Sequence, residues 1–441
     1  MTKGTTRKER REEKQQTNFF FELLKVQRHF FPWLPEELKK RKDPRGAGIT
    51  YPLEVMLSTG LVKNLVSLRS MREMNFQLNT EECIANVWQL AGHKMGGEEI
   101  PHYDTENDYL EKLETEELER VRQRMIQSLL KGRSIEQYRL LGREWCVILD
   151  GTGLYHFHKK HCEHCLRQET TDPKTGEKRT IYLHHVLEAK LLCGEMVLSI
   201  GSEFIENEKE DVEKQDCERK AFYRLAERIK KQDPRLPLCI VADSLYACEP
   251  VFALCERYGW KWIIRFKGGS IPTIAEEAKG IQMAGGWSTC ENGRIQYENE
   301  IAGKHRTVNL LRSKERGAKQ NVTQFQYLTS YSMTNKRAVE IERIGRARWK
   351  IENEGFQRQK EHRYYIGHAF SKNYQAMKNH YLLAQLADIL MQLYEHGAAV
   401  WKRMPCQIKE ISSLLLASIS SRFLTEEDIA QLGKPIRIRF S

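Results

Sequence analysis

The sequence predicts an α/β (α+β) protein in which a sheet-based core follows an all-helical N-terminal region and carries a mainly β insertion. Up to about residue 140 the apolar residues recur at helical spacing, and from residue 142 short apolar runs alternate with amphipathic segments. Residues 268–333 are rich in glycine and in alternating polar and apolar side chains, which is typical of strands. The length of 441 residues leaves room for two or three domains.

The chain is basic. It has 71 lysines and arginines against 60 aspartates and glutamates, a net charge of +11, which favours a polyanionic partner such as double-stranded DNA. No apolar run reaches the roughly 18 to 20 residues of a membrane span, and no signal peptide opens the sequence, so we expect a cytoplasmic protein without a membrane partner. The eleven cysteines, an odd number, are expected to be reduced thiols.

The N-terminal region is expected to be helical after a short tail. Residues 1–16 are charged and nearly devoid of apolar side chains, so they predict a flexible basic tail. Residues 17–140 predict a helical domain, with apolar residues at helical spacing in residues 19–24, 52–57 and 118–130. We expect this domain to bind DNA or to support dimerisation.

The remaining chain predicts a specific order of strands and helices. Strands are expected at residues 145–149, 180–192, 196–200, 238–242 and 260–266, and helices at residues 217–231 and 251–258. Three strands, a helix, a strand, a helix, a strand and a final acidic helix form the element order of the ribonuclease H-like fold. The predicted domains are therefore a ribonuclease H-like core of residues 141–267 and 334–396, a β-rich insertion of residues 268–333, and a C-terminal tail or helices of residues 397–441. Within the core, residues 373–394 predict a long amphipathic helix that covers the sheet.

Two acidic residues close apolar runs, and a third follows in a basic helical stretch. Asp150 ends the run WCVILD, Asp243 ends LCIVAD, and Glu352 lies in RARWKIENEGF. A carboxylate at the end of a buried strand lies at the sheet edge, where open α/β folds place their sites. Three acids there would repel one another unless cations bind, and oxygen ligands suit Mg²⁺ or Mn²⁺. Two such ions can serve both oxygens of a phosphoryl transfer.

Each acid also has an ordinary structural interpretation. An aspartate after a strand is often a turn former or a helix N-cap, and Asp243 before a serine could take that role. Glu352 could be a surface ion-pair partner of Arg348. Glu354 competes with Glu352 for the third position, but it points about 200° round a helix from Glu352. The occurrence of all three acids in this element order favours Asp150, Asp243 and Glu352 as one site.

At these positions the sequence resembles a known family. Asp-Gly-Thr at 150–152, Ala-Asp-Ser at 242–244 and the run at 346–356 resemble the three acidic motifs of DDE transposases of bacterial insertion sequences. More specifically, the sequence resembles the subgroup that carries a β-domain between the second aspartate and the glutamate. The resemblance covers residues 142–396. It implies that Asp150, Asp243 and Glu352 are catalytic and hold two Mg²⁺ or Mn²⁺ ions, with Asp150 bridging them.

The resemblance also implies an activity. Such a protein cuts the ends of its own mobile element and joins the freed 3′-hydroxyl to target DNA, through a hairpin intermediate if the β insertion serves as it does in the subgroup. Synapsis of two ends implies a homodimer on double-stranded DNA, in the bacterial cytoplasm at the nucleoid. Two alternatives stay open: a related structure-selective nuclease that never joins ends, and a domesticated or decayed transposase that binds DNA without catalysis.

The third motif departs from the family pattern at both ends. The family has Tyr-x-x-Arg-x-x-x-Glu with a lysine seven residues beyond the glutamate; this chain keeps Arg348 and Glu352 but has Gly345 at the tyrosine position and Gln359 at the lysine position, with Lys360 next to it. One turn of helix separates Arg348 from Glu352, so the arginine could hold a DNA phosphate beside the carboxylate. The predicted DNA contacts are Arg346, Arg348, Trp349, Lys350, Lys360 and Trp287, the two tryptophans as stacking platforms for a displaced base.

A group of cysteines and histidines follows the first aspartate. Cys162 and Cys165 have the spacing of half a tetrahedral zinc site. Adjacent His184 and His185 on a strand would face opposite sides, so at most one of them is expected to join the same ion. The zinc candidates are Cys162, Cys165, His184 and His161, with His158 or His185 as alternatives to the two histidines. The competing interpretation is a pair of reduced thiols beside histidines that contact phosphates in a loop near the active site.

Overall fold

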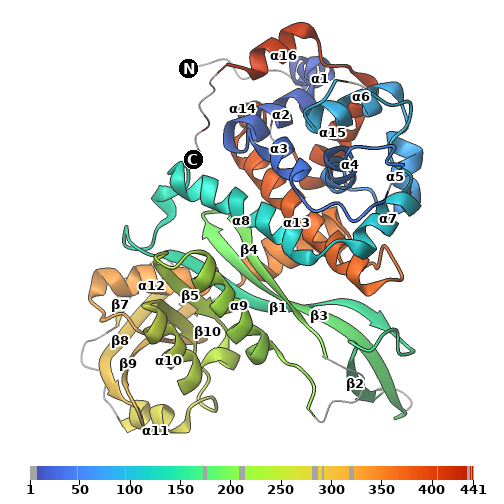
Figure 1. The fold of residues 1–441 in the computed structure, drawn as a ribbon. Coiled ribbons are helices and arrows are strands. Elements are labelled where there is room, and N and C mark those ends of the chain that lie inside the picture. Colours follow the sequence, from blue (N-terminus) through green and yellow to red (C-terminus); the bar gives the residue numbers. More distant parts are fainter. Residues whose placement is uncertain are drawn as a thin grey trace. The chain divides into compact units, whose positions relative to one another are not determined.

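The protein divides into two compact units in a computed structural model (Figure 1). The structure describes residues 7–434, 438 and 440 apart from 47, 95, 172–175, 208–213, 281–286, 291–292, 317–321 and 405. The helical unit comprises residues 1–134 and 357–441, and the sheet unit comprises residues 135–356. The first six residues of the expected tail lie outside the described residues.

The helical unit is built around one long helix. Its elements are α1 (Arg7–Gln16), α2 (Phe19–Phe30), α3 (Leu34–Lys39), α4 (Leu53–Leu65), α5 (Met71–Leu78), α6 (Glu81–Leu90), α7 (Tyr103–Lys112), α8 (Thr115–Lys131), α13 (Tyr374–Gly397), α14 (Ala399–Arg403), α15 (Ile408–Ser421) and α16 (Glu426–Leu432). Helix α13 packs against α2, α4, α7 and α8 and is buried along nearly its whole length. A helix that is buried on every side needs neighbours all round, and here other helices supply them.

This arrangement corrects expectations about α13, about the end of the core and about the two ends of the chain. The segment expected to cover the sheet is α13, whose principal partners are helices of its own unit. The core was expected to run to residue 396, whereas the division between the units falls after Phe356. Residues 7–16 form α1 instead of a flexible tail, and the Lys14 Nζ atom lies 2.5 Å from Glu410 Oε1 of α15. Residues 397–441 are likewise part of the helical unit, because α15 packs on α2 and α6.

The described residues of the sheet unit form a mixed sheet of ten strands. Its elements are η1 (Glu136–Tyr138), β1 (Trp145–Phe157), β2 (Leu166–Thr171), β3 (Lys178–Cys193), β4 (Met196–Ile205), α9 (Glu218–Gln232), β5 (Leu238–Ala242), η2 (Ser244–Tyr246), α10 (Glu249–Tyr258), β6 (Lys261–Arg265), α11 (Pro272–Gly280), β7 (Ser288–Cys290), β8 (Gly293–Ala302), β9 (Thr307–Arg316), β10 (Val322–Thr329) and α12 (Asn335–Ala347). The strand order is β2-β3-β1-β5-β6-β10-β9-β8-β7, with β4 paired to β3. The π-helix η3 (Ile351–Arg363) begins in this unit.

The central strands follow the element order expected from the sequence, with β2 as an additional strand between β1 and β3 along the chain. Strand β1 lies between antiparallel β3 and parallel β5, and β6 continues the parallel pair. The β insertion joins this same sheet, because β10 pairs with β6 in antiparallel fashion. The expected ribonuclease H-like α/β class with a β insertion is therefore confirmed, and the insertion extends the central sheet instead of standing apart from it.

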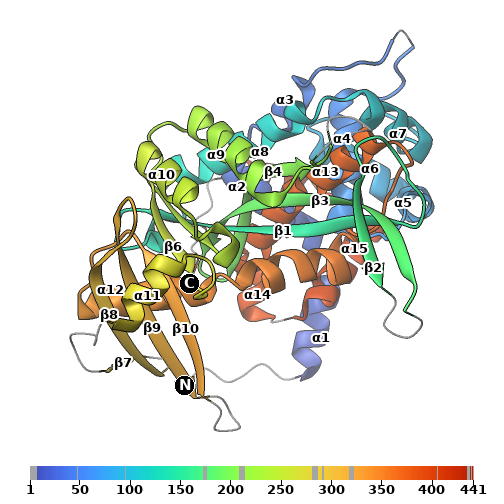
Figure 2. The same ribbon diagram turned by 90° about the horizontal axis from the view of Figure 1, so that it is seen from below.

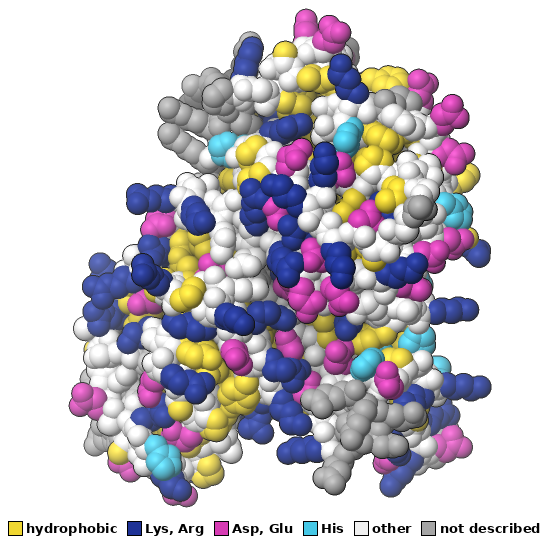
Figure 3. All heavy atoms as spheres, in the orientation of Figure 1, with side chains coloured by type: hydrophobic (Ala, Val, Ile, Leu, Met, Phe, Trp, Pro, Cys, Tyr) yellow, Lys and Arg dark blue, Asp and Glu magenta, His cyan; other side chains and the backbone are white. Residues whose placement is uncertain are grey.

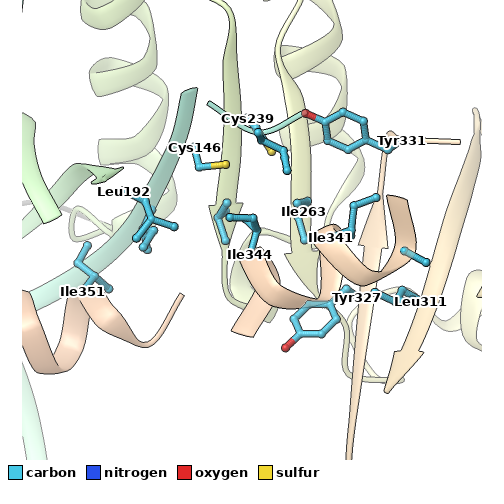
Figure 4. Packing of buried hydrophobic residues seen from close by; sticks show 14 of the residues in the cluster. Cys146, Leu192, Cys239, Ile263, Leu311, Tyr327, Tyr331, Ile341, Ile344 and Ile351 are labelled. Atoms are coloured by element: carbon cyan, nitrogen blue, oxygen red, sulfur yellow. The ribbon is translucent and has the colours of Figure 1, made fainter. Parts of the chain in front are cut away.

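Helices cover both faces of the central strands (Figure 2). On one face, Ile341 and Ile344 of α12 lie over Cys146, Cys239 and Ile263 of three adjacent strands (Figure 4). Side chains alternate along a strand, so the neighbouring residues face the other side. There the Trp262 ring of β6 stacks on Phe252 of α10 with ring centroids 4.2 Å apart. Burial on both faces explains why these strands read as continuous apolar runs.

Two elements differ from their expected ends. Strand β1 was expected to stop at residue 149, but it continues to Phe157 as an antiparallel partner of β3, so Asp150 lies within the strand. The helix expected to run through Glu352 ends at Ala347, and the chain turns before the π-helix starts at Ile351. Wide helical turns of this type occur often at functional sites.

The surface carries its charge without strong segregation on the face shown in Figure 3. Lysine and arginine side chains are scattered there over both units among acidic side chains. Within the described ranges, none of the helices combines the length and the apolar character needed to cross a membrane.

Candidate functional site

Strand register brings Asp150 and Asp243 to the same level of the sheet. Ile148 of β1 pairs with Val241 of parallel β5, and each aspartate comes two residues later. Adjacent strands are about 4.8 Å apart, so the two carboxylates are neighbours. Strand β5 ends at Ala242, and Asp243 Oδ1 accepts a hydrogen bond of 2.8 Å from the Leu245 backbone N–H. The N-cap interpretation of Asp243 is therefore correct, but the cap uses only one of its two oxygens.

Arg348 connects the first acid to the third. Its Nη1 atom lies 3.4 Å from Asp150 Oδ2, and its Nη2 atom lies 2.5 Å from Glu352 Oε1. The interruption between α12 and η3 thus preserves the contact expected of two residues one helical turn apart. The Glu352 side chain is 50% exposed and that of Asp150 is 20% exposed, so the site opens toward solvent on the side of Glu352.

The carboxylates of this site interact unfavourably. The pKa of Asp150 is raised to about 7, mainly by burial and also by the carboxylates of Glu352, Glu218 and Asp243, while Arg348 acts to lower it. Burial would lower the pKa of Arg348, but its hydrogen bond to Glu352 and the nearby aspartates raise it. Arg348 thus offsets part of the negative charge of this cluster.

Glu218 is a fourth acid that the sequence analysis missed. It is the first residue of α9, and a Cβ atom placed on Gly151 would lie only 2.5 Å from Glu218 Oε2. The Tyr246 hydroxyl donates a hydrogen bond of 2.7 Å to Glu218 Oε1. Burial raises the pKa of Glu218, and Asp243 raises it further. The glycine of Asp-Gly-Thr was the available signal, because only a residue without a side chain admits a carboxylate this close.

Of the residues near Arg348 that were expected to contact DNA, one is exposed and two already make contacts within the protein. The Trp349 side chain is 50% exposed. Arg346 lies 3.9 Å above the Phe325 ring and 2.8 Å from Glu315, so it is engaged with the β insertion. Lys350 donates to the Gly194 carbonyl and lies 2.7 Å from Glu195 in the turn between β3 and β4.

The other two residues expected to contact DNA, Lys360 and Trp287, lie in the helical unit and in the β insertion. Burial lowers the pKa of Lys360, which is half-buried in the helical unit. Trp287 of the insertion has the Lys314 ammonium 4.4 Å above its ring.

The two departures from the family motif have packing explanations. A side chain on Gly345 would collide with the Tyr327 ring of β10, whose nearest atom lies 2.7 Å from the position of a Cβ. Gln359 is fully buried in the helical unit, where its amide donates to Gln385 Oε1 at 3.1 Å and to Asp388 Oδ2 at 2.8 Å. The position that holds lysine in the family is thus an interior position here.

The cysteine and histidine group converges at the far end of β1. The sulfur atoms of Cys162 and Cys165 are 3.7 Å apart, and each lies 3.4 Å from His184 Nε2. Burial and the neighbouring Cys165 raise the pKa of Cys162 to about 12. His161 is not in this group of potential ligands among the described residues; its ring stacks on Phe157 with centroids 4.4 Å apart.

The other histidines of this region lie elsewhere. A Cβ on Gly153 would be 3.2 Å from His185 Nε2 and 3.1 Å from His156 Nε2. Because His184 is completely buried beside the cysteines, the two adjacent histidines do occupy different surroundings, as their alternation along β3 predicts.

A ribonuclease H-like sheet with aspartates at one level of two parallel strands places the protein in a class of nucleic-acid-processing enzymes. Residues 142–387 match the family model of the transposase DDE domain, which is more than half of the chain. The chain belongs to this transposase family, as the acidic motifs predicted. Members of the family act on DNA as nucleases and transferases with divalent metal ions. Among curated proteins, none matches the chain.

Proposed function

We propose that the protein cleaves DNA at the ends of its own mobile element and joins the freed 3′-hydroxyl to target DNA, with Asp150, Asp243 and Glu352 as the metal-binding catalytic residues. The observation that carries this proposal is the convergence of the three acids. Parallel register aligns Asp150 with Asp243, and Arg348 ties Glu352 to Asp150.

The donor set fits divalent cations of the Mg²⁺ or Mn²⁺ type. The available ligand atoms are carboxylate oxygens, which these hard ions prefer. The high pKa of Asp150 reflects a carboxylate held in partial burial beside other carboxylates, and a bound cation would relieve that cost. When bound, two such ions supply activation of the attacking oxygen and stabilisation of the leaving oxygen.

The protein's own groups would position the DNA. Arg348 offers a planar guanidinium at the carboxylate cluster, and such a group binds phosphate through paired hydrogen bonds. Exposed Trp349 beside it can stack on an unpaired base at a cleaved end. The net charge of +11 supports attraction to the DNA backbone.

We extend the proposal to the assembly. The two ends of the mobile element must be held together during joining, so the functional assembly is a homodimer on double-stranded DNA. This assembly would act at the nucleoid in the bacterial cytoplasm. Cleavage through a DNA hairpin is one route to the joined product. The competing functions are a nuclease that never joins ends and a decayed transposase that only binds DNA.

The experiment incubates the protein with DNA that carries the element's own ends, with Mg²⁺ or with EDTA, beside an Asp243→Asn variant. We expect end cleavage and joined products only with Mg²⁺, and none from the variant although it still binds the ends. Cleavage without joining would favour the nuclease. Equal binding by both proteins without cleavage under any metal would favour the decayed transposase.

A further inference from the structure

A second ligand cluster lies just beyond the C-terminal end of β1, the strand that carries Asp150. Cys162 and Cys165 occupy the turn between β1 and β2, and His184 belongs to β3. These three residues form a group of potential metal ligands whose ligand atoms all lie within 4.8 Å of one another. Their chemistry differs from the carboxylate site, since two sulfurs and an imidazole nitrogen suit zinc and not magnesium.

The spacing of the three atoms matches one face of a tetrahedron around zinc. With Zn–S near 2.3 Å and Zn–N near 2.05 Å, tetrahedral angles separate two sulfurs by about 3.8 Å and a sulfur from a nitrogen by about 3.6 Å. The observed separations are 3.7 Å between the sulfurs and 3.4 Å from each sulfur to His184 Nε2. All three edges thus fall within about 0.2 Å of the values that a shared zinc ion requires.

The surrounding chain holds these ligands in place. The Cys165 backbone N–H donates to the Cys162 carbonyl at 3.4 Å, which closes the turn that presents both sulfurs. The amide of Asn207, just after β4, donates to the Cys165 carbonyl at 3.0 Å. This hydrogen bond attaches the turn that holds both cysteines to the end of β4, which pairs with β3.

The histidine is enclosed by aromatic rings. The Tyr155 and Phe157 rings of β1 pack edge-on to the His184 imidazole, with centroids 6.3 and 6.1 Å away. The relative exposure of His184 is 0% and that of Cys165 is 3%. Rigid, buried ligands with a fixed ring orientation are what a structural metal site requires.

We propose that Cys162, Cys165 and His184 bind one zinc ion, which ties the turn between β1 and β2 to strand β3. The three side chains leave one position of the tetrahedron for water or another ligand. The ion would fix the distal half of β1 and the basic turn before Cys162, where the side chains of Lys159 and Lys160 are exposed. This inference does not depend on the proposed DNA chemistry.

The test measures metal in the full chain, purified under reducing conditions, freed of its affinity tag and treated briefly with EDTA to remove loosely held ions. We expect inductively coupled plasma mass spectrometry to find about one zinc ion per chain. Cys165→Ser and His184→Ala should each lower this to less than about a tenth. Cys290→Ser is the matched control, a partly buried cysteine of β7, and should keep its zinc.

Two further measurements keep the proposal testable if a variant does not fold. Wild-type protein reconstituted with Co²⁺ should show thiolate-to-cobalt charge-transfer absorption, and trypsin should cut at Lys159 and Lys160 several-fold faster once zinc is removed. The proposal is overturned by wild-type protein that holds no zinc and shows no cobalt–thiolate bands. Zinc retained by folded Cys165→Ser and His184→Ala variants, or a disulfide between Cys162 and Cys165 under the same reducing conditions, would overturn it as well.

Discussion

The two ligand clusters of the sheet unit both adjoin strand β1 but are assembled differently. The cysteine and histidine cluster comes from one local hairpin between residues 162 and 184, whereas the acidic cluster draws on residues from 150 to 352. Tyr155, opposite His184 in the β1–β3 register, lies five residues from Asp150, about 16 Å along a strand. One strand therefore serves two sites that are close in sequence and separate in space.

The clusters also differ in burial and charge. His184 and Cys165 are buried, while the acidic cluster is open on the side of the half-exposed Glu352. Like charges crowd Asp150, Glu218, Asp243 and Glu352, with Arg348 as the counter-charge. An exposed set of oxygens that repel one another suits exchangeable catalytic ions, whereas a buried thiol–imidazole set suits a permanently bound ion. Substitutions at the acidic cluster test this contrast, and the zinc content of each variant should stay unchanged.

The largest effect is expected at the third acid. Glu352→Gln should lower Mg²⁺-dependent end cleavage by at least about a hundredfold, because loss of a direct metal ligand exceeds the usual cost of losing a supporting residue. Glu354→Gln is the matched control two residues away and should stay within about threefold. Cleavage rates at saturating DNA compare the two variants. Equal losses of the cleavage rate in the two variants, or a greater loss in Glu354→Gln, would show that Glu352 is not the third metal ligand.

The next effect concerns the arginine that joins the acids. Arg348→Lys should lower cleavage by about ten- to a hundredfold, since one ammonium cannot reach Asp150 and Glu352 with the paired geometry of a guanidinium. Single-turnover rates, measured with the end-binding affinity, separate a chemical role from a role in DNA binding. A variant that cleaves normally would show that Arg348 serves only to balance charge in the metal-free site.

An effect of about tenfold is expected from pH. The pKa of Asp150 is raised from 3.8 to about 7, so its carboxyl is mostly protonated below pH 7 and ionised above it. Protons compete with the metal, and lowering the pH from 8 to 6 should raise the Mg²⁺ concentration for half-maximal cleavage by about tenfold. Mg²⁺ titrations of cleavage at the two pH values measure this. A metal requirement that does not change with pH would contradict the predicted environment of Asp150.

The smallest effect is expected at Glu218. Glu218→Gln should raise the Mg²⁺ concentration for half-maximal cleavage by about threefold to tenfold if its carboxylate contributes to cation binding. Tyr246→Phe is the companion variant, because it removes the hydrogen bond that holds Glu218 without removing charge, and a smaller change is expected. A lower Mg²⁺ requirement in Glu218→Gln would show instead that Glu218 acts only by repelling its neighbours.

Much of the fold and of the acidic site could be predicted because the signals are local. The apolar runs that end at Asp150 and Asp243 identified two central strands, and their parallel pairing aligns the acids. The Cys-x-x-Cys spacing and the alternation at His184 and His185 likewise depend only on nearby residues. Local patterns of this kind follow from helix and strand periodicity.

The rest could not be predicted, because it depends on which surfaces meet. The periodicity of residues 373–394 shows that they form a buried helix, but only packing shows that the partners are other helices. Strand β1 extends past Asp150 because β3 continues to pair with it there, which no feature of residues 151–157 requires. Glu218 went unnoticed because its approach to Gly151 joins a helix start to a strand far away in the sequence.

The sequence by itself determined the class of the protein, the order of its core elements and the types of residue able to bind metals, since composition, periodicity and short motifs are properties of the chain. Tertiary structure decided which of these residues meet. The three-atom arrangement of Cys162, Cys165 and His184, the fourth carboxylate at Gly151 and the bridge by Arg348 depend on strand register and helix packing. Pairing across a sheet sets these distances, and one residue of slip would turn the same side chains to the opposite face.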